Sequence, residues 1–219
     1  LSWPLIFQVD KIKAMLLINS HLFVRTLCLI FTFGFFTVQG EKLGSTILAT
    51  NAILLNFQTF MAYALDGFAH AAEALIGRAL GANNKRLFQQ SLKSTALWSL
   101  VIALLFTLFY SYAGKDIINS LTHLNAVREQ AYEFIPWVIA LPLISFISFL
   151  MDGVFIGAAL SKQMRDTILL SLFIVFLPAW YFSQHLGNHG LWFSLTLFML
   201  SRSLIMLGIY LYYKNKLLN

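Results

Sequence analysis

The chain has 219 residues, of which 59% are hydrophobic and only 11% are charged. A soluble globular domain usually carries about 25% charged residues, so this composition excludes a soluble protein and predicts an all-α integral membrane protein. The formal net charge is +6, but the basic residues flank apolar stretches instead of forming one patch. The charge therefore indicates orientation in a bilayer, and we expect no nucleic-acid partner.

Six stretches are long and apolar enough to cross a lipid bilayer as helices, which takes about 20 residues each. They cover roughly residues 15–38, 46–79, 88–113, 134–158, 167–184 and 190–213. The polar segments between them, such as 113–130, have loop compositions. The start of the chain lacks an initiator methionine and a signal-peptide pattern, so we expect a fragment or a processed piece.

The lysines and arginines near the span ends predict the orientation, because cytoplasmic loops carry an excess of them. Ten lie on one side, namely Lys11, Lys13, Arg78, Lys85, Arg86, Lys93, Lys162, Arg165, Lys214 and Lys216. Three lie on the other side, namely Lys42, Lys115 and Arg128. This difference predicts a multi-pass protein of the cell's inner (plasma) membrane with both chain ends in the cytoplasm.

The second span carries an unusual number of polar side chains for a membrane helix. At about 100° per residue, Asn51, Gln58, Asp66, His70 and Glu73 share one arc of the helix. A charged residue at the bilayer centre costs about 2.5–3.5 kcal/mol, so such residues face the bundle interior or a cavity. We therefore expect this arc to border a cavity, with Glu73 nearer the cytoplasmic end.

The fourth span repeats the pattern, since Ser148 and Asp152 share one face. Arg25 in the first span and Arg202 in the sixth are candidate ion-pair partners for the acids. Glu73 is likewise a candidate ion-pair partner for a basic group. Two interpretations stay open. Permanent Asp–Arg pairs would make a static core, whereas an acid held away from water can bind and release a proton or hold a cation.

Catalytic and metal-binding patterns are missing from the sequence. No second His or Cys lies at ligand spacing from His70, so we expect no metal site. Neither a Ser–His–Asp set nor a Gly-rich phosphate loop is present. The sequence predicts no enzyme and no cofactor.

Two Asp-Gly pairs occur in similar surroundings, "ALDGFAHAAEAL" in the second span and "LMDGVFIGAALS" in the fourth. Internal symmetry is common in secondary transporters. Both pairs fall in the cytoplasmic half of helices that run in the same direction. We expect the two helices to form two walls of one cavity.

These segments also resemble a known family. "YALDGFAHAAEALIGRALGANN", followed by "FLMDGVFIGAALSKQMRD", is similar to the second half of a multidrug and toxic compound extrusion (MATE) transporter of the DinF-like subfamily. The resemblance implies one six-helix lobe of a twelve-helix protein, with the N-terminal lobe absent from this chain. It implies antiport of organic, often cationic, compounds such as drugs against H⁺ or Na⁺ by alternating access, driven by the ion gradient.

The resemblance also carries over some residues. Asp152 matches an acid of the tenth helix that relatives use for cation coupling or substrate binding, and Asp66 and Glu73 belong to the DinF-like signature. Some branches have an acid in the seventh helix, where this chain has Arg25, and this difference weakens the case for a Na⁺ site. Taken together with the polar faces of the second and fourth spans, these matches give the expected ion- or substrate-coupling residues, which are Asp66, His70, Asp152, Gln58, Asn51 and Ser148.

The sequence leaves two alternatives open. One is a lipid-linked oligosaccharide flippase of similar architecture, which would need several basic residues around its cavity to meet a pyrophosphate. The other is a truncated, non-functional fragment.

Overall fold

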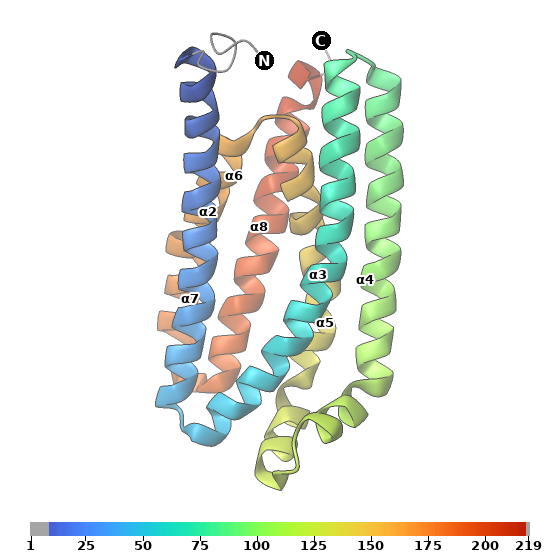
Figure 1. The fold of residues 1–219 in the computed structure, drawn as a ribbon. Coiled ribbons are helices and arrows are strands. Elements are labelled where there is room, and N and C mark those ends of the chain that lie inside the picture. The colour runs from blue at the N-terminus through green and yellow to red at the C-terminus, as the bar shows by residue number, and fades with distance from the viewer. Residues whose placement is uncertain (1–8, 218–219) are drawn as a thin grey trace.

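The computed structural model describes residues 9–217, which form an all-α bundle (Figure 1). Within this described range, six helical stretches are long and apolar enough to cross a membrane, which confirms the predicted fold class. The elements are α2 (Val9–Lys42), α3 (Ser45–Gly81), α4 (Lys85–Leu121), α5 (Asn125–Gly157), α6 (Ser161–Leu170), a π-helical turn (Ser171–Phe176), α7 (Leu177–Ser183), a 3₁₀ turn (Gln184–Leu186) and α8 (Asn188–Leu217). Our expectation about the start of the chain concerns residues 1–8, which lie outside the described part.

Successive spans run in opposite directions, and short connections join them (Figure 1). The described chain begins with α2 and finishes with α8 at the same end of the bundle, drawn at the top of Figure 1. The α3–α4 and α5–α6 connections also lie at that end. We call it the predicted cytoplasmic end, and the opposite end the predicted outer end, because only the lysine and arginine distribution assigns the sides.

The segment between the third and fourth spans differs from the prediction. Residues 113–130 were expected to form a loop, but α4 continues to Leu121 and α5 begins at Asn125. Arg128 joins the two helix ends, because its Nε donates to the carbonyl of Thr122 and its Nη2 to the carbonyl of Asn119, both at 2.8 Å. A basic side chain at a helix C-terminus satisfies carbonyls that have no partner within the helix. The loop prediction was wrong because a polar composition also suits helix ends that project into water.

The fifth span is interrupted by a π-helical turn at Ser171–Phe176. The N–H of Leu177 donates to the carbonyl of Leu172, five residues earlier, instead of four. Pro178 follows directly, and a proline inside a helix has no N–H and crowds the preceding turn. The wider turn accommodates this proline, and π-turns of this kind are rare in helices.

α5 and α3 cross at very small residues. A Cβ on Gly153 would overlap the backbone of Ala69, and a Cβ on Gly157 would approach the carbonyl of Glu73 to 2.5 Å. The two backbones are therefore in direct contact, as occurs where small residues line a membrane helix interface. This crossing fixes the position of Asp152 on α5 relative to the polar arc of α3.

The apolar core is divided into two clusters along the bundle axis. The cluster toward the predicted outer end contains Leu65 of α3, Phe149 of α5 and Met199 of α8, while the cluster toward the predicted cytoplasmic end contains Ala72 of α3 and Met206 of α8. On α3, Asp66 comes after Leu65 of the first cluster and before Ala72 of the second. On α8, Arg202 likewise comes between Met199 and Met206. The polar residues predicted from the sequence thus gather at the level where one apolar cluster gives way to the other.

Candidate functional site

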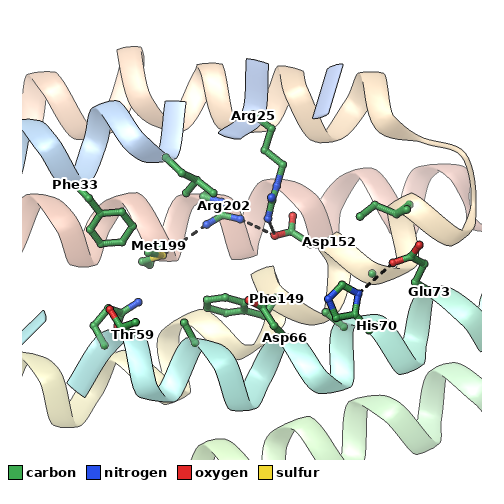
Figure 2. Close-up of a pocket in the computed structure, with 16 residues that line it drawn as sticks. Arg25, Phe33, Thr59, Asp66, His70, Glu73, Phe149, Asp152, Met199 and Arg202 are labelled. Carbon is green, nitrogen blue, oxygen red and sulfur yellow. Dashed lines mark hydrogen bonds and ion pairs between the residues drawn. The ribbon is translucent and has the colours of Figure 1, made fainter. Parts of the chain in front are cut away.

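A cavity of about 340 Å³ lies between α2, α3, α5 and α8 (Figure 2). Its polar lining comes from all four helices, and its apolar lining includes aromatic rings. The polar and charged lining residues include Arg25, Gln58, Asp66, His70, Glu73, Asp152 and Arg202, and the apolar ones include Leu29, Phe33, Phe149 and Met199. The volume is within the range of small-molecule sites, about 300–1,000 Å³.

Asp152 is the buried centre of an ionic cluster at one wall of this cavity. Its Oδ2 accepts a hydrogen bond from Nη2 of Arg202 at 2.9 Å and another from Nη2 of Arg25. Figure 2 shows both guanidinium groups converging on this carboxylate from α2 and α8. Asp152 is only 4% exposed, so its charge is compensated by protein groups instead of water. The prediction that Arg25 and Arg202 are ion-pair partners is confirmed for Asp152.

The cluster is not fully satisfied by hydrogen bonds. Oδ1 of Asp152 and Nε of Arg25 are buried, and neither has a hydrogen-bond partner among the described residues. The side chain of Arg25 is 21% exposed, whereas that of Arg202 is 4% exposed. Arg25 is therefore the basic group that a molecule in the cavity can reach, and Arg202 is the one that holds Asp152 inside the protein.

Asp66 differs from Asp152 in its surroundings. It is half-buried on α3 and lines the same cavity. Within residues 9–217, its carboxylate takes part in no hydrogen bond and no ion pair. The pairing with arginine that we considered for both acids is thus present for Asp152 and absent for Asp66 within residues 9–217.

His70 and Glu73 form a pair on the same helix, one turn closer to the predicted cytoplasmic end. Nδ1 of His70 lies 3.4 Å from Oε2 of Glu73, and their side chains are 78% and 38% exposed. Glu73, a candidate ion-pair partner for a basic group, thus lies beside His70, and no ion pair joins it to Arg25 or Arg202 within residues 9–217. It lies at the same helical level as Gly157, too far along α3 to reach the cluster around Asp152.

Gln58 lines the cavity toward the predicted outer end. Its side chain is buried, and its Oε1 has no hydrogen-bond partner in the described part of the chain. It lies eight residues before Asp66 on α3, which places the two about 12 Å apart along the helix axis. Gln58 therefore has an unsatisfied amide oxygen that is enclosed beside the cavity.

Two predicted site residues lie outside the cavity. Asn51 is buried near the predicted outer end, where it exchanges hydrogen bonds with Asn188 at 2.8 and 3.0 Å and accepts one from Nε1 of Trp192 at 2.9 Å. Ser148 is fully buried and donates to the carbonyl of Ser145 at 2.8 Å. Both side chains are used in helix packing, so the structure gives no support to our assignment of Asn51 and Ser148 to solute binding. Residues that share one arc of a helix can face either the cavity or a neighbouring helix, and the spacing alone does not tell which.

Sequence reasoning did not identify the apolar wall. Leu29 and Phe33 follow Arg25 at intervals of four residues on α2, and Met199 precedes Arg202 by three residues on α8. Such intervals place side chains on one face of a helix, so this spacing could have predicted the wall once the arginines were placed.

Comparisons with known proteins agree with this architecture. The MatE family profile matches residues 22–182. The chain is 38% identical over 203 residues to "DNA damage-inducible protein F" of Escherichia coli (strain K12). That match covers 90% of this chain and 43% of the relative, so the chain spans less than half the length of this relative.

Three solved structures have the same fold over most of this chain. A MOP superfamily transporter from Pyrococcus furiosus matches with a TM-score of 0.79 and 19% identity, covering 92% of this chain and 45% of its own. The eukaryotic MATE transporter AtDTX14 matches with a TM-score of 0.75 and 13% identity, covering 85% and 44% respectively. A MATE structure in the bent conformation matches with a TM-score of 0.74 and 13% identity, covering 89% and 43%.

Proposed function

Because the chain belongs to the MATE family of membrane transporters, we propose that it is the C-terminal six-helix lobe of an exporter of organic cations. The exporter exchanges its substrate for H⁺, or for Na⁺, by alternating access. The lobe assignment is supported by the six spans and by the match to less than half of each relative's length. The N-terminal lobe would then supply the other side of the transport path.

The observation that carries this proposal is the unpaired Asp66 at a cavity of suitable size. A carboxylate that is partly removed from water is most stable when it binds a proton or lies beside a cation. A single such carboxylate accepts one or the other, because binding of a proton removes the charge that holds the organic cation. Competition of this kind links release of the substrate to uptake of a proton, which is the requirement for antiport.

The same geometry favours H⁺ over Na⁺ as the coupling ion. A metal cation needs several oxygen ligands, and the best buried carboxylate, Asp152, is already occupied by two guanidinium groups. Asp66 contributes one carboxylate, and Gln58 lies about two helical turns away from it. A proton needs only one acceptor, so Asp66 alone is sufficient for it.

The experiment replaces Asp66 with Asn in the complete gene product as the cell makes it. Efflux of a fluorescent cationic dye from cells is then measured with and without a proton gradient. We expect the Asp66→Asn variant to lose gradient-dependent efflux while it keeps normal abundance in the membrane. Asp116→Asn is the matched control, because Asp116 is an exposed acid at the far end of α4, and this variant should export like the wild type. Normal efflux by the Asp66→Asn variant would contradict the proposal.

We also propose that the described ends of α2 and α8 face the cytoplasm in the inner (plasma) membrane. The ten-to-three distribution of lysines and arginines supports this orientation. Cys28 is the single cysteine, so a Cys28→Ala background allows one new cysteine to be labelled by an impermeant reagent. A cysteine at position 84, in the α3–α4 connection, should be protected in intact cells, and one at position 123 should be labelled. The reverse pattern would invert the orientation.

The alternative of a lipid-linked oligosaccharide flippase has less support. A pyrophosphate needs several free basic groups, whereas both arginines of the cavity bind Asp152. The Pyrococcus furiosus transporter is described as having a binding pocket of reverse polarity that suggests a different function, so pocket polarity is the property to measure. Movement of a fluorescent lipid across vesicles that contain the complete protein would favour the flippase, and gradient-dependent movement of a cationic dye would favour the exporter.

The DNA sequence upstream of this region tests the lobe assignment directly. We expect an open reading frame that encodes six further spans. A stop codon in that frame would support the truncated fragment instead.

A further inference from the structure

The hairpin of α3 and α4 carries an uncompensated positive charge at the predicted cytoplasmic end. Residues 74–115 contain five basic side chains and no acidic one, and four of the five, Arg78, Lys85, Arg86 and Lys93, lie in or near the α3–α4 connection. Arg86 and Lys93 are exposed on α4, and neither takes part in a hydrogen bond or an ion pair within residues 9–217. Both charges are therefore available to a group outside the described protein.

The depth of Lys93 in the bilayer follows from the charge pattern of α4. Residues 94–114 contain no charged side chain. At 1.5 Å per residue they cover about 31 Å, and the hydrocarbon core of a bilayer is about 30 Å thick. Lys93 and Lys115 thus mark the two boundaries of the hydrocarbon on this helix. Lys93 lies at the level of the lipid headgroups, and Arg86 lies seven residues, or about 10 Å, further out.

The two basic residues point away from the rest of the bundle. Phe88, Ser91 and Thr95 form the buried side of α4 at this end. Lys93 and Arg86 lie about 140° and 160° around the helix from Phe88. α4 packs against α3 and α5 at the edge of the bundle (Figure 1), and none of the residues that line the cavity comes from α4. The outward side of α4 therefore faces lipid.

Exposed leucines continue this side of α4 into the hydrocarbon. At about 100° per residue, one arc of about 60° contains Arg86, Gln90, Lys93, Leu97, Leu104 and Leu108, all of which are exposed. The helix rises about 16 Å from Leu97 to Leu108, and one leaflet of the hydrocarbon core is about 15 Å thick. The arc thus has a basic part at the headgroups and an apolar part as long as one leaflet.

Trp98 gives a second indication of the lipid headgroups at this level. Its side chain is 55% exposed, and its indole N–H donates no hydrogen bond within the described part of the chain. Exposed tryptophans of membrane helices are enriched at the interface, where the ring meets apolar groups and the N–H meets polar ones. Trp98 lies five residues inside Lys93, where its N–H can reach the ester groups of a lipid.

We propose that this arc of α4 binds an anionic phospholipid of the leaflet at the α3–α4 end. Its phosphate lies beside Arg86 and Lys93, because Lys93 extends from the edge of the hydrocarbon toward the headgroups. One acyl chain lies along Leu97, Leu104 and Leu108. A zwitterionic lipid fits less well, since the cation of its headgroup is repelled by both basic residues. The proposal goes beyond the transport function and does not depend on it.

The test measures the quenching of a fluorophore attached at position 97. The complete protein, with Leu97→Cys as its single reactive cysteine, is labelled and placed in phosphatidylcholine vesicles. Either phosphatidylglycerol or phosphatidylcholine with a nitroxide at the same acyl carbon is then added in increasing amounts. We expect phosphatidylglycerol to quench at a lower mole fraction, because each basic residue near a membrane surface favours an anionic lipid about fivefold.

Variants of the two basic residues assign this preference to the site. Arg86→Gln and Lys93→Gln should each lower it about fivefold, and the double variant should abolish it. Arg86→Lys and Lys93→Arg keep the charge and should retain it. Lys162→Gln is the matched control, because Lys162 is an exposed base near the same end of the bundle on α6, and this variant should leave the preference unchanged.

Four results would overturn the proposal. They are equal quenching by the two lipids in the wild type, a preference that the double variant keeps, a loss in Lys162→Gln as large as in Lys93→Gln, and no quenching by either lipid, since protein would then cover this face. If the double variant aggregates, the salt dependence of the wild type decides. The preference should fall as salt rises, because salt screens exposed charges, and a constant preference would contradict the proposal.

Discussion

The two Asp-Gly pairs have the same sequence but very different surroundings. Asp152 on α5 is buried and bonded to two arginines, while Asp66 on α3 is half-buried and has no partner among the described residues. Gly153 is pressed against the backbone of Ala69, whereas a Cβ on Gly67 would meet no atom within 4 Å. One pair holds the bundle together, and the other presents a free acid to the cavity.

The difference follows from the position of each helix. α5 packs against α3, α4 and α8, so its polar residues are surrounded by other helices. α3 diverges from α2 above their short connection, as Figure 1 shows, and the cavity is lined by both of these helices. The acid at the centre of the bundle is compensated by two protein cations, whereas the acid at the cavity wall is left to be neutralised by a proton or a solute.

The largest expected effect is on stability and comes from Asp152. Its replacement by Ala leaves two guanidinium groups facing each other without a counter-ion, and loss of one partner from a buried ionic cluster costs about 3–5 kcal/mol. Asp66→Ala removes an unpaired acid and should change the stability by less than about 1 kcal/mol. The midpoints of thermal unfolding in detergent, measured for both variants, check this order. Equal midpoints would remove the structural distinction between the two acids.

The two glycines should give effects of opposite sign. A methyl group on Gly153 must push α5 away from Ala69, and overpacking of this kind costs about 1–3 kcal/mol. Gly67→Ala adds a methyl group in open space on a helix, where Ala is favoured over Gly by about 0.5–1 kcal/mol. Abundance in the membrane and the thermal midpoint should therefore fall for Gly153→Ala and stay or rise for Gly67→Ala. A fall for both would mean that Gly67 packs against a surface that the described residues do not provide.

The smallest effect is expected for His70. Its side chain is mostly exposed, and its interaction with Glu73 is long. Exposed pairs of this kind contribute about 0–1 kcal/mol, so His70→Ala should leave the thermal midpoint unchanged and alter dye efflux by less than about twofold. A loss of efflux as large as that expected for Asp66→Asn would place His70 in the coupling step together with Asp66.

The sequence contained enough information to predict the fold class and part of the site. Hydropathy predicts the six spans, and the helical arc of α3 brings Gln58, Asp66 and His70 to one cavity. The pairing of Arg25 with Asp152 joins residues 127 positions apart, so local patterns cannot choose it over a pairing with Asp66. Tertiary packing alone decides which acid is neutralised.

Other features could not be predicted for related reasons. Asn51 shares the arc of Asp66, but near the predicted outer end α8 covers that arc and supplies Asn188 and Trp192 as partners. The polar segment 113–130 combines two helix ends with a short connection, and composition does not distinguish such ends from a loop. In both cases the deciding information lies on a neighbouring helix.

The central claim is that Asp66 is the group that exchanges a proton for the solute. Its most direct test is the proton release that accompanies binding of a cationic dye to the purified complete protein in weakly buffered detergent solution. We predict release of protons on binding by the wild type and by Asp116→Asn, and none by Asp66→Asn. Undiminished release by Asp66→Asn would show that another group carries the proton and would contradict the account.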